Sequence, residues 1–143
     1  MRIYRMTALA LAVAFAAVGL VFLFAPGAVQ GAFDSLGRQA GIKGMPEGDA
    51  ESGLFRVLAV AYMYIVTLLA WMMFRRPADP VWPALLAQAK FASALVSILL
   101  FALAGPYLVY AANGVVDGLI GVAVLLLRRH LAPPRSSPVG GWR

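Results

Sequence analysis

Residues 106–127, PYLVYAANGVVDGLIGVAVLLL, form an apolar stretch of 22 residues whose single charged side chain is Asp117. The stretch lacks the period-2 alternation of a barrel strand, so it predicts an α-helix. At a rise of about 1.5 Å per residue, this helix is long enough to cross the roughly 30 Å hydrocarbon core of a bilayer. The stretch therefore predicts a transmembrane helix.

Three further apolar stretches precede it, at 6–25, 53–74 and 81–104. Charged residues make up 13% of the chain, about half the share of an ordinary soluble domain. We predict an all-α fold: an integral membrane four-helix bundle in a single domain over 1–130, followed by a flexible, basic cytoplasmic tail over 131–143. The first stretch is longer than the roughly 7 to 15 apolar residues of a signal peptide, so we expect it to be retained as a span.

The positive charges are concentrated on one side of the predicted membrane. The 26–52 connection has only Arg38 and Lys43, beside four acidic residues. Eight of the twelve Lys and Arg residues fall at the two termini or in the connection between the second and third stretches: Arg2, Arg5, Arg75, Arg76, Arg128, Arg129, Arg135 and Arg143. Because cytoplasmic segments near span ends are enriched in Lys and Arg, we predict that both termini are cytoplasmic.

The connection over residues 26–52 is predicted to lie outside the cytoplasm. Val29, Phe33 and Leu36 recur at helical spacing, which indicates a short amphipathic helix on the outer membrane interface. Residues 44–52 are interpreted as an acidic turn. A solvated loop is the plainer interpretation of this connection, and it is the one we favour.

Small and polar residues of the 106–127 stretch share one face of the predicted helix. Gly114 and Gly118 form a small-xxx-small motif that allows another helix to approach closely, and Asn113 and Asp117 could hydrogen-bond across that contact. At 100° per residue the face holds Tyr110, Asn113, Gly114, Asp117, Gly118 and Gly121. We expect this face to pack against protein.

Asp117 lies near the middle of its stretch, where an unpaired charge costs about 2.5 to 3.5 kcal/mol on insertion scales. It must therefore be protonated or paired. One interpretation is a proton or cation site. We favour the other, a carboxyl group that fixes helix register, because a single acid without a second acid or histidine nearby makes a poor relay.

Lys90, in the 81–104 stretch, is the candidate partner of Asp117. It lies about 6 Å further toward the cytoplasm, and the two side chains lean apart because each leans toward its own helix N-terminus. We therefore predict that Lys90 snorkels to the cytoplasmic headgroups. The alternatives are a direct or water-bridged tie to Asp117 or Asn113, and a ligand-binding role.

Ser93 and Ser97 continue the small face of Lys90, so we expect the third and fourth spans to pack closely there. Arg56 lies one turn inside the 53–74 stretch, with Ser52 before it as a candidate N-cap. We expect Arg56 to snorkel or to pair with the acids of the 26–52 connection rather than to clamp a substrate. His130 follows Arg128 and Arg129, and we expect it to be solvated.

The sequence offers few groups for catalysis. It has no cysteine and one histidine, and it contains no Ser-His-Asp set, no paired carboxylates with acid/base spacing, no metal-ligand cluster and no phosphate loop. We predict a non-enzyme with no metal and no required cofactor, although lipid, quinone or pigment could bind between the spans. The net charge of +6 lies at the membrane edges and does not indicate a nucleic-acid partner.

Three functions fit these observations. The first is an accessory or assembly subunit of a larger membrane complex, in keeping with the short connections and glycine-lined face. The second is a homo-oligomeric small transporter, or a proton or ion pathway, built on Tyr110, Asn113 and Asp117. The third is a subunit that binds quinone or pigment. The partners expected are the lipid bilayer and either other membrane subunits or copies of this chain, and the composition favours a bacterial inner membrane.

Overall fold

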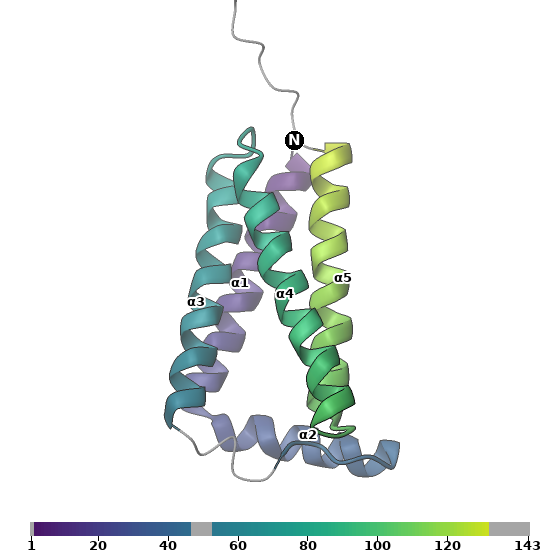
Figure 1. Ribbon diagram of the computed structural model, residues 1–143. Coiled ribbons are helices and arrows are strands. Elements are labelled where there is room, and N and C mark those ends of the chain that lie inside the picture. Colours follow the sequence, from purple (N-terminus) through teal and green to yellow (C-terminus); the bar gives the residue numbers. More distant parts are fainter. Residues whose placement is uncertain (1, 47–52, 132–143) are drawn as a thin grey trace, which may run out of the picture.

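A computed structural model describes residues 2–46 and 53–131, with His130 and Leu131 described by their backbone only. The described residues form an all-α fold (Figure 1). Four of the helices are long and apolar enough to cross a membrane, which suggests a multi-pass membrane protein. The five helices are α1 (Arg2–Phe24), α2 (Pro26–Ala40), α3 (Gly53–Arg75), α4 (Val81–Leu103) and α5 (Leu108–Leu131).

The four long helices form two antiparallel pairs. α1 packs along α3, and α4 packs along α5, whereas α3 and α4 contact each other less and α1 and α5 less still (Figure 1). The described chain begins and ends at the same end of the bundle, beside the turn between α3 and α4. This arrangement agrees with the prediction that the two termini lie on one side.

The buried apolar core occupies the half of the bundle that carries the chain ends. It draws on the first two thirds of α1, the second half of α3, the start of α4 and the end of α5. Its members are Tyr4, Ala8, Ala12, Phe15, Val66, Ala70, Met73, Leu86, Ala87 and Val124. The opposite half of the bundle is packed less densely, and this is where α2 lies.

α2 runs across the end of the bundle away from the chain ends (Figure 1). Pro26 stands in its first turn, and Gly41 ends it with φ 71°, while Ile42 N donates to Gly37 O at 3.0 Å and Gly41 N donates to Arg38 O at 3.3 Å. These two bonds form the Schellman motif, for which glycine is favoured because it tolerates a left-handed backbone.

The solvated loop favoured for this connection is therefore wrong over residues 26–40, and the amphipathic helix is confirmed there. Val29 and Phe33 are half-buried against the bundle, whereas Leu36 is 54% exposed. Residues 47–52 of the acidic turn, with the candidate N-cap Ser52, lie outside the described residues, as does the tail from residue 132.

The chain after α2 doubles back and caps α5. Leu108 N donates to Lys43 O at 2.8 Å, and Val109 N donates to Gly44 O at 3.1 Å. These bonds satisfy two of the N–H groups that every helix start leaves without an internal partner. α5 consequently begins at Leu108, so the helix start expected at residue 106 is wrong by two residues.

The returning segment is held tightly against α2. Met45 N donates to the Asp34 carboxylate at 3.2 Å. A Cβ atom at Gly44 would overlap the backbone of Asp34, and one at Gly37 would overlap the backbone of Gly44. Glycine is required at both positions because the two backbones touch.

Candidate ligand-binding site

A buried ion pair joins α4 to α5 near the centre of the bundle. Lys90 Nζ lies 2.9 Å from Asp117 Oδ1, and the two side chains are 2% and 5% exposed. Lys90 belongs to the buried stripe of α4, together with Pro83, Leu86, Ala87, Ala94 and Ser97. The ammonium group therefore points into the bundle.

The predicted snorkelling of Lys90 is wrong. A path along the inside of the bundle toward the chain ends is filled by the core, where Leu86 is fully buried and Ala87 is 1% exposed. The long lysine side chain instead spans the roughly 6 Å difference in depth to Asp117. Pairing lowers the penalty of holding both charges away from water.

Two aromatic rings complete the surroundings of the ammonium group. Lys90 Nζ lies 4.5 Å from the ring centroid of Phe15 on α1 and 5.0 Å from that of Tyr62 on α3. Both distances are within the range of cation–π attraction, which is stronger where water is excluded. Tyr62 also donates its hydroxyl hydrogen to Ala89 O at 3.1 Å. All four long helices thus contribute to the surroundings of this ion pair.

Asn113 lies one turn before Asp117 and ties α5 to α4 a second time. Its side-chain nitrogen donates to Ser93 Oγ at 3.1 Å and to Ser97 Oγ at 2.7 Å. Ser93 and Ser97 therefore meet the polar face of α5 as predicted. We refer to Lys90, Asp117, Asn113, Ser93 and Ser97 as the polar cluster.

One oxygen of the polar cluster is unpaired. Asp117 Oδ2 is buried and has no hydrogen-bond partner among the residues that the structure describes. The Tyr62 hydroxyl lies near Asp117 but donates to Ala89 O at 3.1 Å, and the Asn113 amide donates to the two serines. A buried polar atom left unpaired usually costs about 1 to 3 kcal/mol, so it requires an explanation.

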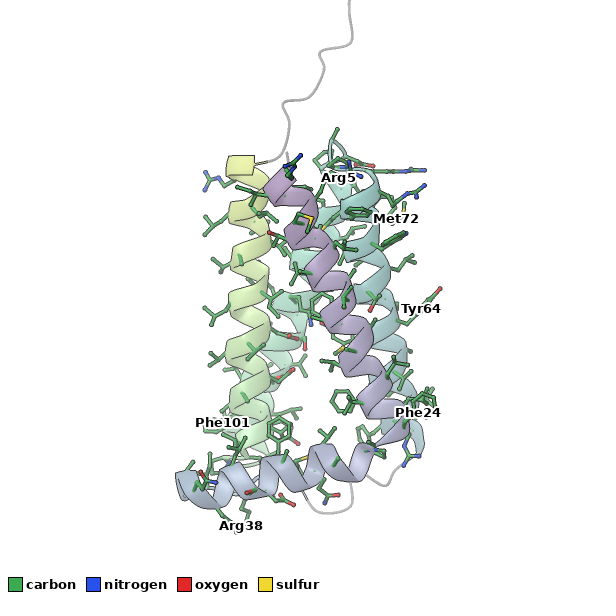
Figure 2. The ribbon with its side chains drawn as sticks, turned by 180° about the vertical axis from the view of Figure 1, so that it is seen from behind. Arg5, Phe24, Arg38, Tyr64, Met72 and Phe101 are labelled. Atoms are coloured by element: carbon green, nitrogen blue, oxygen red, sulfur yellow. The ribbon has the colours of Figure 1, made fainter. Side chains whose placement is uncertain are left out.

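The polar cluster opens into a cavity between the two helix pairs. One part, of about 670 Å³, lies between α1 and α5 above α2; Lys90, Asn113 and Asp117 line it, and the rest of its wall is apolar. A second part, of about 390 Å³, lies between α3 and α4. Both parts are lined by Phe22, Val29, Met63, Val109 and Asn113, so we treat them as one inter-hairpin cavity. Figure 2 shows how α1 and α5 diverge toward α2, which leaves room for this space.

Arg56 and Tyr110, two of the predicted site residues, line the part of the cavity between α3 and α4. Arg56 is exposed and lies near the start of α3. Tyr110 is half-buried, and its ring packs edge-on against the ring of Tyr107, with 5.8 Å between the two ring centroids. Glu47, Asp49 and Glu51, three of the acids proposed as partners of Arg56, lie outside the described residues. The structure thus brings Tyr110, Asn113, Asp117 and Lys90 to one cavity and places Arg56 at its edge.

The glycines of α5 face α4, but not equally closely. A Cβ atom at Gly121 would lie 2.7 Å from the Phe91 ring, and one at Gly114 would lie 3.2 Å from Ile98. At Gly118 the nearest atom would be Ala94 Cβ at 3.9 Å, which is ordinary contact. The tight helix contacts are therefore at Gly114 and Gly121, and Gly118 is not the close-approach position that the sequence indicated.

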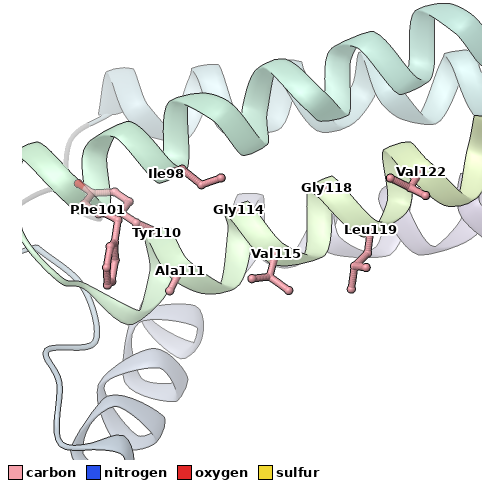
Figure 3. Close-up of a pocket in the computed structure, with 9 residues that line it drawn as sticks. All are labelled: Ile98, Phe101, Tyr110, Ala111, Gly114, Val115, Gly118, Leu119 and Val122. Carbon is pink, nitrogen blue, oxygen red and sulfur yellow. The ribbon is translucent and has the colours of Figure 1, made fainter.

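Gly118 instead lines an apolar groove of about 390 Å³ along α4 and α5. In Figure 3, Gly114 and Gly118 lie on the side of α5 that faces α4, while Val115 and Leu119 point away from α4. Val115 and Leu119 are 63% and 65% exposed, so this side of α5 is uncovered.

Sequence reasoning missed Phe15 and Tyr62 as members of the site. Helical spacing does place each on a buried face, since Phe15 follows Tyr4, Ala8 and Ala12, and Tyr62 precedes Val66, Ala70 and Met73. That signal identifies an inward face only. It does not show that α1 and α3 both meet Lys90, because this depends on how the helices pair.

The side chain of His130 lies outside the described part of the chain, so its predicted solvation remains a prediction. Among the described residues, no group of three or more His, Asp or Glu side chains is placed to hold a metal ion. No protein-family model, curated protein or solved structure matches this chain.

Proposed function

We propose that this chain is a multi-pass membrane protein that binds a lipid-soluble ligand in the inter-hairpin cavity. The observation that carries the proposal is an apolar cavity of about 670 Å³ whose wall holds one buried group of polar side chains. Sites for small molecules are typically cavities of about 300 to 1,000 Å³ with mostly apolar walls and a few convergent polar groups. An apolar chain would fill the space, and a polar head would meet the polar cluster.

The packing of the bundle favours binding over a proton or ion pathway. The inter-hairpin cavity lies on the α2 side of Asp117, and on the other side the core closes the bundle with fully buried Val66, Ala70 and Leu86. A pathway requires polar groups or water on both sides of the central charge. The ligands that this proposal covers include the quinone and pigment classes, and the chain itself carries out no reaction in it.

Filling the cavity is expected to remove the ligand. Ala112 lines the cavity on α5, so Ala112→Phe places a ring in the space that the ligand would occupy. Because the ring removes most of the apolar contact between protein and ligand, we expect at least about a tenfold loss of bound small molecule. The measurement is solvent extraction of the purified protein followed by mass spectrometry, normalised to protein. Ala123→Phe is the matched control, because Ala123 is exposed on the same helix. Equal amounts of ligand in the two variants, or none in the unmodified protein, would contradict the proposal.

We further propose that both chain ends face the cytoplasm, on the basis of the eight edge positive charges on that side. A cysteine at Gly31, which has open space around it on α2, should react with an impermeant thiol reagent in intact cells. A cysteine at Ala78, exposed in the α3–α4 turn, should react only after the membrane is permeabilised. The reverse pattern would overturn the orientation.

A second proposed role is that of an accessory subunit, and the uncovered groove beside Gly118 favours it (Figure 3). The occupant would be an apolar helix of another membrane subunit. Gly118→Leu fills the groove, whereas Leu126→Ala trims an exposed side chain of α5 outside the groove, so we expect only Gly118→Leu to reduce the yield of co-purified subunits, by about tenfold. The measurement is quantitative mass spectrometry after purification in mild detergent, and an unchanged subunit content in Gly118→Leu would refute this role.

A further inference from the structure

The unpaired oxygen of Asp117 indicates which chemical group the cavity accepts. We infer that the ligand carries an uncharged hydroxyl group, as in a lipid alcohol, a phenol or a hydroquinone, and that this hydroxyl donates to Asp117 Oδ2. The inference rests on the proposed function, because it concerns the head of the ligand that the inter-hairpin cavity would hold.

The free oxygen of Asp117 calls for a hydrogen-bond donor on the ligand. Asp117 lines the cavity, its side chain is 5% exposed, and Oδ2 lacks a partner among the described residues. An ionised carboxylate oxygen only accepts hydrogen bonds, so its ligand partner must be a donor. In the structure the Tyr62 hydroxyl lies near Asp117 but donates to Ala89 O, the Asn113 amide donates to the two serines, and Lys90 meets the other oxygen, Oδ1.

The charges on the cavity wall favour an uncharged head. Lys90 and Asp117 lie 2.9 Å apart, so together they add no net charge to the wall. An anionic head would be repelled by Asp117, and its attraction to Lys90 would be offset because that ammonium already meets Asp117, Phe15 and Tyr62. A cationic head would be repelled by Lys90. An uncharged donor avoids both repulsions and loses the least hydration on entering an apolar cavity.

Matched photoreactive probes test the inference. Three probes share a sixteen-carbon chain with a mid-chain diazirine and differ only in the head, which is a hydroxyl, a methyl ether or a carboxylic acid. The protein is reconstituted in phosphatidylcholine vesicles, and labelling is mapped by peptide mass spectrometry. We expect the alcohol to label the cavity residues Val109 and Ala112 about tenfold more than the ether does, since a hydrogen bond to a buried charged group is lost in the ether.

The double variant Lys90→Met with Asp117→Leu provides the control. It removes the carboxylate acceptor without leaving a lone buried charge, a replacement that protein cores tolerate better than a single change. We expect the variant to lose the preference for the alcohol and to keep the labelling by the ether. Retention of the preference in the variant would overturn the inference.

The remaining outcomes distinguish a wrong head group from an absent binding site. Equal labelling of the cavity by alcohol and ether in the unmodified protein, or stronger labelling by the acid, would overturn the hydroxyl head and leave ligand binding intact. If every probe labelled Val109 and Ala112 no more strongly than the exposed Leu126, both the hydroxyl head and the proposed ligand binding would be contradicted.

Discussion

Replacing Asp117 with leucine is expected to lower the free energy of unfolding by about 3 to 5 kcal/mol, because it leaves the Lys90 ammonium buried without its counter-ion. The group cannot escape to water in the folded state, since the lysine side chain is 2% exposed and lies within the bundle. The change can be measured by titrating the detergent-solubilised protein with sodium dodecyl sulfate and following helix content or fluorescence.

The matched variants make this test a double-mutant cycle. Lys90→Met alone should destabilise the protein by a similar amount, since it leaves Asp117 buried and unpaired, while the double variant Lys90→Met with Asp117→Leu should recover most of the loss. Additive losses in the double variant would show that the two side chains do not interact and would contradict the pairing at 2.9 Å.

The second large effect is expected at Gly44. A valine there would push its Cβ atom into the backbone of Asp34, and no rotamer change can relieve an overlap with main-chain atoms. We expect Gly44→Val to lower the free energy of unfolding by about 3 kcal/mol or more, at the upper end of what overpacking produces. The same denaturant titration measures it, and hydrogen exchange of the Leu108 and Val109 amides should rise as their contacts with Lys43 O and Gly44 O are lost.

Gly31→Ala supplies the control for this prediction. Gly31 lies inside α2, and a Cβ atom added there would meet no other atom within 4 Å. Alanine should therefore leave stability unchanged or raise it by up to about 1 kcal/mol through its higher helix propensity. If Gly44→Val were tolerated as well as Gly31→Ala, the close packing of the returning segment against α2 would be wrong.

Much of the fold can be predicted from hydropathy and helical spacing because both report on single helices. The four apolar stretches correspond to α1, α3, α4 and α5, and the face of α5 that carries Asn113, Gly114, Asp117 and Gly121 does meet α4. A side chain's position around its own helix is fixed by the 100° step alone. This is why the polar face is predicted correctly although the contact at Gly118 is not.

The 100° rotation per residue does not determine which helices contact each other. The sequence does not show that α3 packs mainly along α1 and less along α4, which follows it after a tight turn, and hence it does not show that Phe15 and Tyr62 meet at Lys90. Counting depth along separate helices predicts that Lys90 and Asp117 lean apart. That prediction neglects the length of the lysine side chain, which is enough to reach Asp117. It also neglects the buried core, which blocks the path from Lys90 toward the chain ends.

The pairing of Lys90 with Asp117 has a consequence for how the proposed membrane protein is made. Lys90 belongs to α4 and Asp117 to α5. These two helices are consecutive in the chain and are joined by only four residues, Ala104 to Tyr107. Each charge therefore has its counter-ion within the same helical hairpin. During synthesis this hairpin can leave the translocon and enter lipid as one electrically neutral unit, without contacts from α1 and α3, so that the cost of about 2.5 to 3.5 kcal/mol for a single charge in lipid is not incurred twice.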